Sequence, residues 1–143
     1  MPQLFLIAQL AGRAVAIESG QVESVVDIGT VVPVPRAGRQ VCGLAALRSR
    51  VVTVIDTRAA LGLAPAEVPM TRAVITFVDG HHYAILVDAL EDVAPFDLQP
   101  LSSGIVLDHG WRATGCGIVE RKGEAILAID LRALVPGLTA IAA

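Results

Sequence analysis

The chain of 143 residues is long enough for one domain, or for two closely joined subdomains that would each be only marginally stable alone. Hydrophobic residues make up 54% of it and charged residues 17%, which excludes a disordered protein and indicates a dense core with apolar surface left for docking. The formal net charge is -3, and basic residues cluster only in the pairs Arg36/Arg39 and Arg48/Arg50, so nucleic acid and anionic membrane are not expected partners.

Short strands are predicted from the N-terminus onward. Ala11-Gly12 and Asp79-Gly80 mark hairpin turns. The N-terminal apolar run has no basic segment before it, so it predicts a strand and not a signal peptide, and no apolar stretch approaches the ~18 residues of a membrane span. We therefore expect a soluble, cytoplasmic protein. The apolar, β-branched segments recur at the close spacing typical of an all-β sandwich or barrel: Leu4–Leu10, Arg13–Ile17, Val22–Ile28, Val31–Pro35, Leu44–Leu47 and Val51–Ile55.

Two continuously apolar segments, Val51–Ile55 and Ala125–Ile129, each end at an aspartate that is followed by a short helical pattern. An aspartate in this position accepts hydrogen bonds from backbone amides two or three residues further on. Asp56 and Asp130 are therefore predicted to be structural N-caps.

The chain contains an internal repeat. Residues 42–61 align without a gap on residues 116–135, and residues 5–25 align on residues 73–93, with twelve of the 41 paired positions identical. The repeats extend over about 5–62 and 73–137, and a connector at 64–71 with two prolines separates them. A duplicated, pseudo-symmetric body has a seam, and ligands and partners tend to bind at such seams.

The repeated aspartates raise the possibility of an aspartic-protease pair, in which two carboxylates share a proton. That chemistry needs an Asp-Thr-Gly turn, whereas the third positions here are Arg58 and Arg132. A guanidinium two residues from each carboxylate favours a structural ion pair, so the sequence argues against this enzyme.

Other catalytic and metal-binding motifs are also weak. Cys42 and Cys116 occupy equivalent repeat positions without a neighbouring histidine, and we interpret both as small buried core residues. His81 and His82 follow a predicted hairpin turn, and His109 lies in a predicted loop, where solvated polar residues are expected. We expect no metal, no cofactor and no catalytic residue, and we interpret the chain as a binding module.

Taken together, several segments make the chain resemble the CheW-like domains of bacterial chemosensory arrays. Val15-Ala16-Ile17 matches a Tyr-Ala-Ile-like strand, and Val22–Val25 matches a Val-x-Glu-Val segment. The most diagnostic stretch of the family is Val-x-Gly-(Leu/Ile/Val)-x-Asn-Leu-Arg-Gly-x-(Val/Ile)-x-Pro-(Val/Ile)-(Val/Ile)-Asp-Leu-Arg, and residues 41–58 read VCGLAALRSRVVTVIDTR. The resemblance covers nearly the whole chain.

The resemblance implies an all-β fold of two pseudo-symmetric five-stranded β-barrels with short helical turns, forming one CheW-like domain. It also implies two interfaces. A groove between the barrels would take the helical cytoplasmic tip of a methyl-accepting chemoreceptor, and a barrel end would dock on the regulatory domain of the histidine kinase CheA. The residues that match the groove, with Arg48 at its rim, are Val22, Ser24, Val25, Val41, Leu44 and Arg48.

Four positions depart from the family pattern: Ser24, Ala46, Ser49 and Thr53 stand where the family has Glu, Asn, Gly and Pro. Without a glutamate at Ser24, Arg48 needs another acid, and Glu23 or Asp27 could supply it if the strand is bulged. The resemblance implies a non-catalytic adaptor that couples chemoreceptors to a CheA-type kinase at receptor arrays on the inner membrane. The alternative is a CheW-like interaction module of a non-flagellar chemosensory or regulatory pathway.

Overall fold

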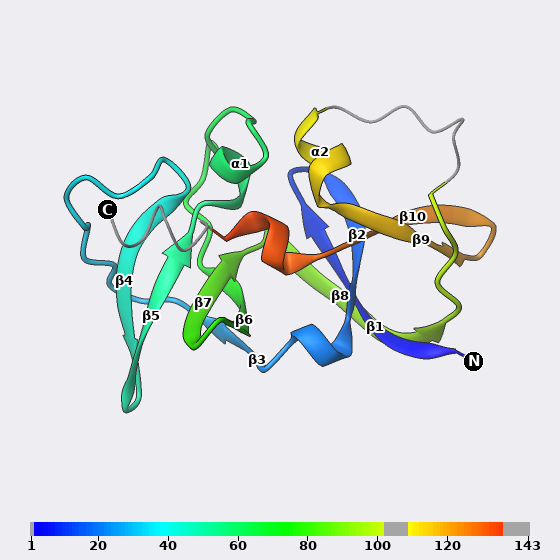
Figure 1. The fold of residues 1–143 in the computed structure, drawn as a ribbon, viewed down its shortest axis with the longest axis horizontal. Coiled ribbons are helices and arrows are strands. Elements are labelled where there is room, and N and C mark those ends of the chain that lie inside the picture. Colours follow the sequence, from blue (N-terminus) through cyan, green and yellow to red (C-terminus); the bar gives the residue numbers. More distant parts are fainter. Residues whose placement is uncertain (1, 102–108, 136–143) are drawn as a thin grey trace.

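The computed structural model of the chain describes residues 2–101 and 109–135, so residues 102–108 and the last two residues of the second predicted repeat lie outside it. Ten strands dominate the described part, with only short helical turns between them (Figure 1). The elements are β1 (Gln3–Leu10), β2 (Arg13–Glu18), η1 (Ser19–Gln21), β3 (Ser24–Asp27), β4 (Val41–Leu47), β5 (Arg50–Ile55), α1 (Thr57–Ala60), β6 (Arg72–Val78), β7 (His81–Leu86), β8 (Ala89–Phe96), α2 (His109–Thr114), β9 (Gly115–Arg121), β10 (Glu124–Ile129) and η2 (Leu131–Leu134).

The strands form two five-stranded sheets. Sheet A has the order β8-β1-β2-β10-β9, and sheet B has the order β3-β6-β7-β5-β4. In each sheet one central pair is parallel, β2 with β10 and β5 with β7, and the other pairs are antiparallel. The expected pseudo-symmetric all-β fold is confirmed, although the backbone ladders of the described strands do not close into complete barrels.

Each sheet combines strands from both sequence repeats. Sheet A takes β1 and β2 from the first repeat and β8, β9 and β10 from the second, while sheet B takes β6 and β7 from the second repeat and β3, β4 and β5 from the first. Neither repeat contains a complete sheet. The seam of the molecule therefore lies between the two sheets and not between the two halves of the sequence.

Hairpin turns join neighbouring antiparallel strands as the sequence predicts at Ala11-Gly12 and Asp79-Gly80. In both turns, and at Lys122-Gly123, the two residues have positive φ angles between 49° and 82°, the backbone that matches the twist of a tight hairpin. The β4–β5 turn differs because Arg48 has a φ of 52° but is followed by Ser49 and not by glycine.

Three predictions of local structure are wrong. The expected strand at Val31–Pro35 is reduced to one isolated bridge between Val32 and Leu44, because its two prolines cannot donate to a ladder. Strand β4 begins at Val41, earlier than expected. The backbone of His109 begins helix α2 and does not lie in a loop, and this helix places Trp111 in the core, where its side chain is 4% exposed.

A core shared by the sheets fills the seam, and each curved sheet encloses a smaller core of its own. Alternation along β2 shows the division, since Val15 and Ile17 face the shared core while Ala16 faces the core of sheet A. The fully buried large side chains of the shared core tie the sheets into one body: Leu10, Ile17, Ile55, Tyr83, Ile85, Ile129, Leu131 and Leu134.

The repeated glycines Gly43 and Gly117 serve the same structural purpose in the two sheets. A Cβ atom on Gly43 would lie 2.2 Å from the carbonyl oxygen of Val32, and one on Gly117 would lie 2.6 Å from that of Gln99. At both places a returning segment forms an isolated bridge with the next residue of the strand. The identity of the two glycines thus follows from the close approach of backbone to backbone.

Candidate functional site

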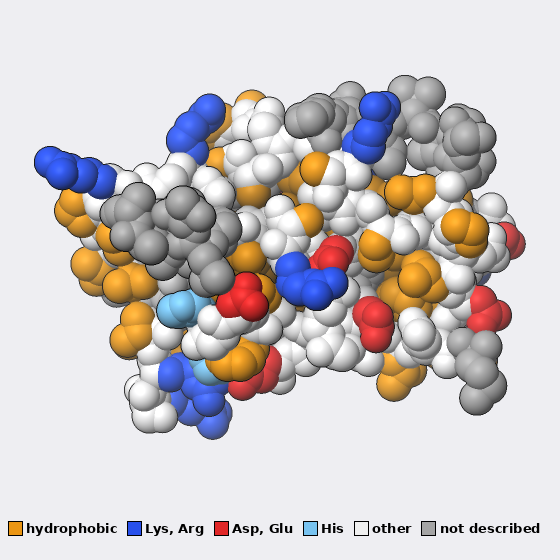
Figure 2. All heavy atoms as spheres, in the orientation of Figure 1, with side chains coloured by type: hydrophobic (Ala, Val, Ile, Leu, Met, Phe, Trp, Pro, Cys, Tyr) orange, Lys and Arg blue, Asp and Glu red, His pale blue; other side chains and the backbone are white. Residues whose placement is uncertain are grey.

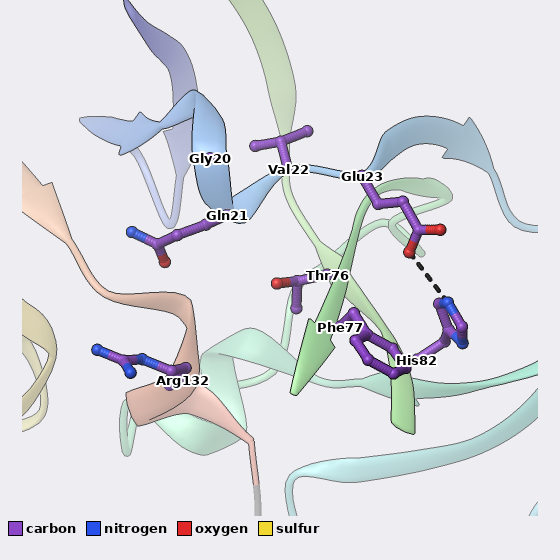
Figure 3. Close-up of a pocket in the computed structure, with 8 residues that line it drawn as sticks. All are labelled: Gly20, Gln21, Val22, Glu23, Thr76, Phe77, His82 and Arg132. Carbon is purple, nitrogen blue, oxygen red and sulfur yellow. Dashed lines mark ion pairs between the residues drawn. The ribbon is translucent and has the colours of Figure 1, made fainter. Parts of the chain in front are cut away.

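An open hollow of about 670 Å³ lies at the seam, between η1 and η2 on one side and β6 and β7 of sheet B on the other. We call it the seam hollow. Figure 3 shows its lining side chains, which come from four separate elements. The lining residues are Gly20, Gln21, Val22, Glu23, Thr76, Phe77, His82 and Arg132.

Phe77 gives the seam hollow an apolar contact surface. It is the largest of the hydrophobic side chains that remain mainly exposed in the described residues, at 57% relative exposure, in a chain with only 3% aromatic residues. Its ring lies 4.6 Å from the His82 ring, centre to centre, and Val22 adds a half-buried aliphatic side chain from the other wall. An aromatic side chain left in solvent beside a hollow is suited to bury a partner's apolar side chain.

A polar cluster borders the same hollow. Glu23 Oε1 lies 2.8 Å from Arg50 Nη1, and Glu23 Oε2 lies 3.0 Å from His82 Nε2, a contact drawn as a dashed line in Figure 3. Arg50 Nη1 also lies 2.6 Å from His82 Nε2. The backbone amide of Glu23 donates to the carbonyl of Ile75, which fixes the acid beside β6.

The opposite wall of the hollow is held by η2. Gln21 Oε1 accepts a hydrogen bond of 2.7 Å from the backbone amide of Leu131, which joins η1 to η2. The residue after Leu131 is Arg132, which forms an ion pair with Asp130 at 2.9 Å. The hydrogen bonds from Arg132 hold the pKa of the Asp130 carboxyl below its ordinary value, and the same carboxylate raises the pKa of Arg132.

The two repeated aspartates have the geometry of caps. Asp56 Oδ1 accepts a hydrogen bond of 3.1 Å from the amide of Ala59 at the start of α1, and Asp130 Oδ1 accepts one of 3.0 Å from the amide of Arg132 at the start of η2. Asp130 also forms an ion pair with Arg132, which is the structural use that the sequence predicts for a carboxylate two residues from an arginine. Each carboxylate is thus engaged by its own helical start.

A second surface lies on the outer face of β4 and β5. The register places Val32 opposite Leu44 and Ala46 opposite Val51, so these four side chains share one face. Their neighbours Ala45 and Val52 point into the core of sheet B, whereas Val32 and Val51 are 62% and 60% exposed. We call this surface the β4 flank, and Figure 2 shows hydrophobic side chains gathered along that side of the molecule.

The stretch of sequence that contains the β4 flank is rich in arginine, and of these arginines Arg50 pairs with Glu23. No aspartate or glutamate occurs between Asp27 and Asp56, while this stretch contains four arginines. All four are exposed: Arg36, Arg39, Arg48 and Arg50. A partner for this face should therefore combine apolar and acidic side chains.

The two cysteines are free, and only one matches the predicted core role. Cys42 is half-buried and packs against the core of sheet B, but Cys116 is exposed. Burial first, and then the neighbouring carboxylates Asp56 and Asp130, raise the pKa of each thiol above its ordinary value. Both thiols are therefore poor nucleophiles at neutral pH.

Metal ligands do not cluster in residues 2–101 and 109–135, where no three His, Cys, Asp or Glu side chains are placed to hold an ion. Over the same residues, no helix has the length and apolar character needed to span a membrane.

The fold and the seam can be compared with known proteins. A family model for the CheW-like domain matches residues 4–138. The chain belongs to the CheW-like domain family. Among its relatives, chemotaxis protein CheW of Rhizobium meliloti is 33% identical over 109 residues, which cover 73% of this chain and 68% of the relative. Chemotaxis protein CheW of Thermotoga maritima is 24% identical over 127 residues, covering 89% and 83%.

A solved structure has the same fold. The crystal structure of the scaffolding protein TtCheW from Thermoanaerobacter tengcongensis superimposes with a TM-score of 0.78 at 23% identity. The match covers 91% of this chain and 90% of TtCheW. The two-sheet architecture is thus a property that this chain shares with other CheW-like domains.

The structure places the six residues that the resemblance implies for a receptor groove in different settings. Val22, Val25 and Val41 are all half-buried against the shared core, and Val22 also lines the seam hollow. Ser24 is exposed on β3, and Leu44 lies on the β4 flank at 37% exposure. In the strand order of sheet B, β3 and β4 occupy the two outer positions.

The acid expected to pair with Arg48 pairs elsewhere. Glu23 binds Arg50, and Asp27 binds Arg72 at 2.9 Å. Within the described residues, Arg48 forms no ion pair and stands in the β4–β5 turn, outside the lining of the seam hollow. The resemblance implies a polar contact between positions 48 and 24, and the structure shows an ion pair between Glu23 and Arg50.

Sequence reasoning missed most of the hollow, including Gln21, Thr76, Phe77, His82 and Arg132 as lining residues. One signal was present, because Phe77 and His82 align with Gln9 and Ala14 of the first repeat. An aromatic residue and a titratable residue thus replace a polar and a small one at two nearby positions. Such chemical divergence between repeats marks where the two copies have different uses.

Proposed function

We propose that this chain is a non-catalytic scaffold that couples chemoreceptors to a CheA-type histidine kinase in bacterial chemotaxis. The observation that carries the proposal is that a CheW-like fold presents two distinct contact surfaces, the seam hollow and the β4 flank. An adaptor that holds two partners at once needs two such surfaces. In this function the chain acts in the cytoplasm, at receptor arrays beneath the inner membrane.

The seam hollow suits the helical tip of a methyl-accepting chemoreceptor. Its volume of about 670 Å³ accommodates a few side chains and not a whole helix, so a helix would lie across the opening and insert apolar residues against Phe77 and Val22. Glu23, Arg50 and Arg132 supply charged groups at its rim for orientation. Apolar anchors with a few polar contacts are typical of helix-in-groove recognition.

The β4 flank suits the CheA regulatory domain. Its apolar side chains project from an edge strand, and the arginines around it select for an acidic surface. The apolar side chains of the flank are not among the residues that line the hollow, so the two partners would use different apolar anchors, while Arg50 is a charged group of both surfaces. Simultaneous binding is therefore part of the proposal.

A second candidate is a CheW-like module of a non-flagellar chemosensory or regulatory pathway. The displacement of the ion pair from Arg48 to Arg50 favours it, because a moved charge pair changes which partners are accepted. Such a module would bind a receptor or kinase other than those of flagellar motility, through the same two surfaces.

Reconstitution with purified partners tests the proposal. We expect the chain to form binary complexes with a chemoreceptor cytoplasmic-tip fragment and with a CheA regulatory domain, and a ternary complex with both, measured by size-exclusion chromatography with light scattering. Val51→Glu should remove the kinase complex and keep the receptor complex. Val68→Glu is the matched control, since Val68 is 73% exposed but belongs to the connector, where it lines a hollow with Asp27, Arg72 and Asp88 and with no residue of the flank. Binding of neither partner would refute the proposal.

A further inference from the structure

A second hollow opens at one end of sheet B, and none of its lining residues belongs to the seam hollow or to the apolar set of the β4 flank. We call it the sheet B pocket. Its walls come from the segment that follows β3, from the ends of β5 and β7 and from the connector between the repeats. Its volume of about 550 Å³ and its mainly apolar walls are typical of sites for small molecules. The apolar side chains that line it include Ile28, Val31, Val54, Met70 and Leu86.

A bulge in β4 brings the thiol of Cys42 to this pocket. The register between β4 and β5 shifts between Val41 and Gly43, which leaves Cys42 without a partner in the ladder. A bulge of this kind changes the direction in which a side chain points. The half-buried Cys42 lines the pocket, so its thiol reports chemically on what occupies that space.

Asp56 is the one charged residue among the described residues that line the sheet B pocket. Its Oδ1 atom accepts from the amide of Ala59, and within the part of the chain that the structure describes it forms no ion pair. A carboxylate has about four acceptor sites, so the cap leaves most of them free. A negative charge beside apolar walls is stabilised by a cation that reaches it. The pocket therefore complements a ligand with an apolar body and a positively charged end.

The equivalent aspartate in sheet A already has its cation. Asp130 accepts from Arg132 Nη2 at 2.9 Å and from Arg132 Nε at 3.2 Å. Arg58 is the matching arginine, but in residues 2–101 and 109–135 it pairs with no carboxylate and is not among the residues that line the pocket. Its Nε atom is buried without a hydrogen bond in the described structure. Sheet B thus keeps the acid without the internal cation.

The wall beside the cysteine has diverged in the same direction. By the repeat alignment, Leu86 corresponds to Glu18. Leu86 lines the pocket that Cys42 also lines, whereas Glu18 is a second carboxylate near Cys116. Burial first, and then the carboxylates of Asp130 and Glu18, raise the pKa of the Cys116 thiol. Sheet B therefore has an apolar wall where sheet A has a charged one.

We propose that the sheet B pocket binds a small amphipathic amine. The apolar body of the amine packs against Ile28, Val31 and Met70. Its ammonium group donates to the carboxylate of Asp56, while the amide of Ala59 keeps its own hydrogen bond. An ammonium group has three donors, so one such group satisfies the free acceptor sites of the acid. This site gives the chain a small-molecule ligand in addition to the two protein partners proposed above.

The binding experiment compares n-octylamine, octan-1-ol and octanoate at pH 7 by calorimetric titration of the whole chain. The three probes share one alkyl chain and differ in the charge of the head group, and the amine is protonated at this pH as a lysine side chain is. Octylamine should bind about tenfold more tightly than octan-1-ol, and octanoate should bind most weakly. Asp56→Asn, which keeps a good cap, should reduce the affinity for octylamine to that for octan-1-ol. Asp130→Asn is the matched control and should keep the tenfold preference.

The two thiols show where the amine binds. Cys116→Ser leaves Cys42 as the one cysteine of the chain, and Cys42→Ser leaves Cys116. Octylamine at ten times its Kd fills about nine-tenths of the sites, so it should slow the reaction of Cys42 with Ellman's reagent about tenfold and leave that of Cys116 unchanged. Equal slowing of both thiols, or an unchanged rate at Cys42, would overturn the proposal. Equal affinity of the wild type for octylamine and octanoate would do so as well, whatever the stability of the Asp56→Asn variant.

Discussion

Residues that line the seam hollow have equivalents in the other copy of the repeat, and the two sets of side chains differ in chemistry. By the repeat alignment, Phe77 and His82 correspond to Gln9 and Ala14, and Arg132 corresponds to Arg58. In the hollow, Phe77 is 57% exposed, whereas Gln9 is half-buried and donates to Glu91 at 2.5 Å. Arg132 reaches solvent beside Asp130, whereas the Nε atom of Arg58 is buried without a hydrogen bond in the described structure.

This difference shows how one duplicated unit acquires two uses. Glu23 and Glu91 are identical in the alignment, and each binds an arginine, Arg50 or Arg121. The backbone and this acid have been kept, while the residues that decide polarity and exposure have changed. One set of equivalent positions therefore leaves an aromatic side chain exposed, and the other is occupied by its own hydrogen bond.

The largest effect on binding should come from giving each of the equivalent positions Phe77 and Gln9 the residue of the other. Phe77→Gln should weaken binding of a chemoreceptor tip by about 30-fold, or about 2 kcal/mol, because a central aromatic anchor is lost. The free energy of unfolding should change by less than about 0.5 kcal/mol, since the side chain is largely exposed. Calorimetric titration and thermal unfolding measure the two quantities.

The reciprocal substitution is the matched control for that exchange. Gln9→Phe removes the hydrogen bond to Glu91 and should not create a second binding site. A stoichiometry of two tips per chain in this variant would show that the aromatic residue alone, and not its setting in the hollow, makes a site.

Removing a capping aspartate should have a smaller effect than Phe77→Gln. The loss of stability should be similar for the two aspartates. Asp56→Ala and Asp130→Ala should each cost about 1 kcal/mol, a decrease in Tm of about 3 °C, because each removes a side-chain acceptor at a helical start. Unfolding in urea measures the loss. A cost of several kcal/mol at either position would mean that the residue supports more than a cap.

Lowering the pH should reduce the contribution that the carboxylate of Asp130 makes to the stability of the fold. Its pKa is lower in the folded chain than its ordinary value, so the ion pair with Arg132 stabilises the fold above about pH 4 and this contribution is lost as the pH falls through the folded pKa. Asp130→Asn keeps a good cap but cannot ionise. The variant should be less stable than the wild type at pH 6, and the difference should shrink at pH 3.

A still smaller effect on stability should distinguish Arg50, which pairs with Glu23, from Arg48, which matches the family arginine. Arg50→Ala should lower stability by less than about 1 kcal/mol, since a half-exposed ion pair contributes little, and it should also change tip affinity. Arg48→Ala should leave stability unchanged, and tip affinity too if the hollow alone receives the tip. Weakened tip binding in Arg48→Ala with normal binding in Arg50→Ala would restore Arg48 to the groove rim, as the family resemblance implies.

The sequence could predict the fold because its signals are local or repeated. The hairpin at Asp79-Gly80 and the cap at Asp56 depend on residues within three positions, and the repeat doubles each signal. A strand at Val31–Pro35 was wrongly predicted because its β-branched residues favour a strand, whereas Pro33 and Pro35 cannot donate to a ladder and leave one bridge between Val32 and Leu44.

The hollow could not be predicted in the same way, because it depends on how the repeats interlock. Gln21 reaches Leu131 across 110 positions of sequence, and Glu23 reaches His82 only because β3, β5, β6 and β7 share one sheet. No pattern within a single repeat contains that exchange of strands. The ion pair between Glu23 and Arg50 could not be predicted either, because the family pattern contains an arginine at position 48 and none at position 50.

The smallest expected effect concerns the two cysteines, which again compare equivalent positions. Cys116 is exposed and Cys42 is half-buried, so Ellman's reagent should modify Cys116 first. Burial and a neighbouring aspartate raise the pKa of both thiols, so both rates should still be rising between pH 8 and pH 9, where an ordinary thiol begins to level off. Cys116→Ser identifies the fast phase. If Cys42 reacted first, sheet B would have to open more readily around Cys42 than its packing against the core of that sheet indicates. The β4 flank, which lies on the same strand, could then not be a rigid docking surface.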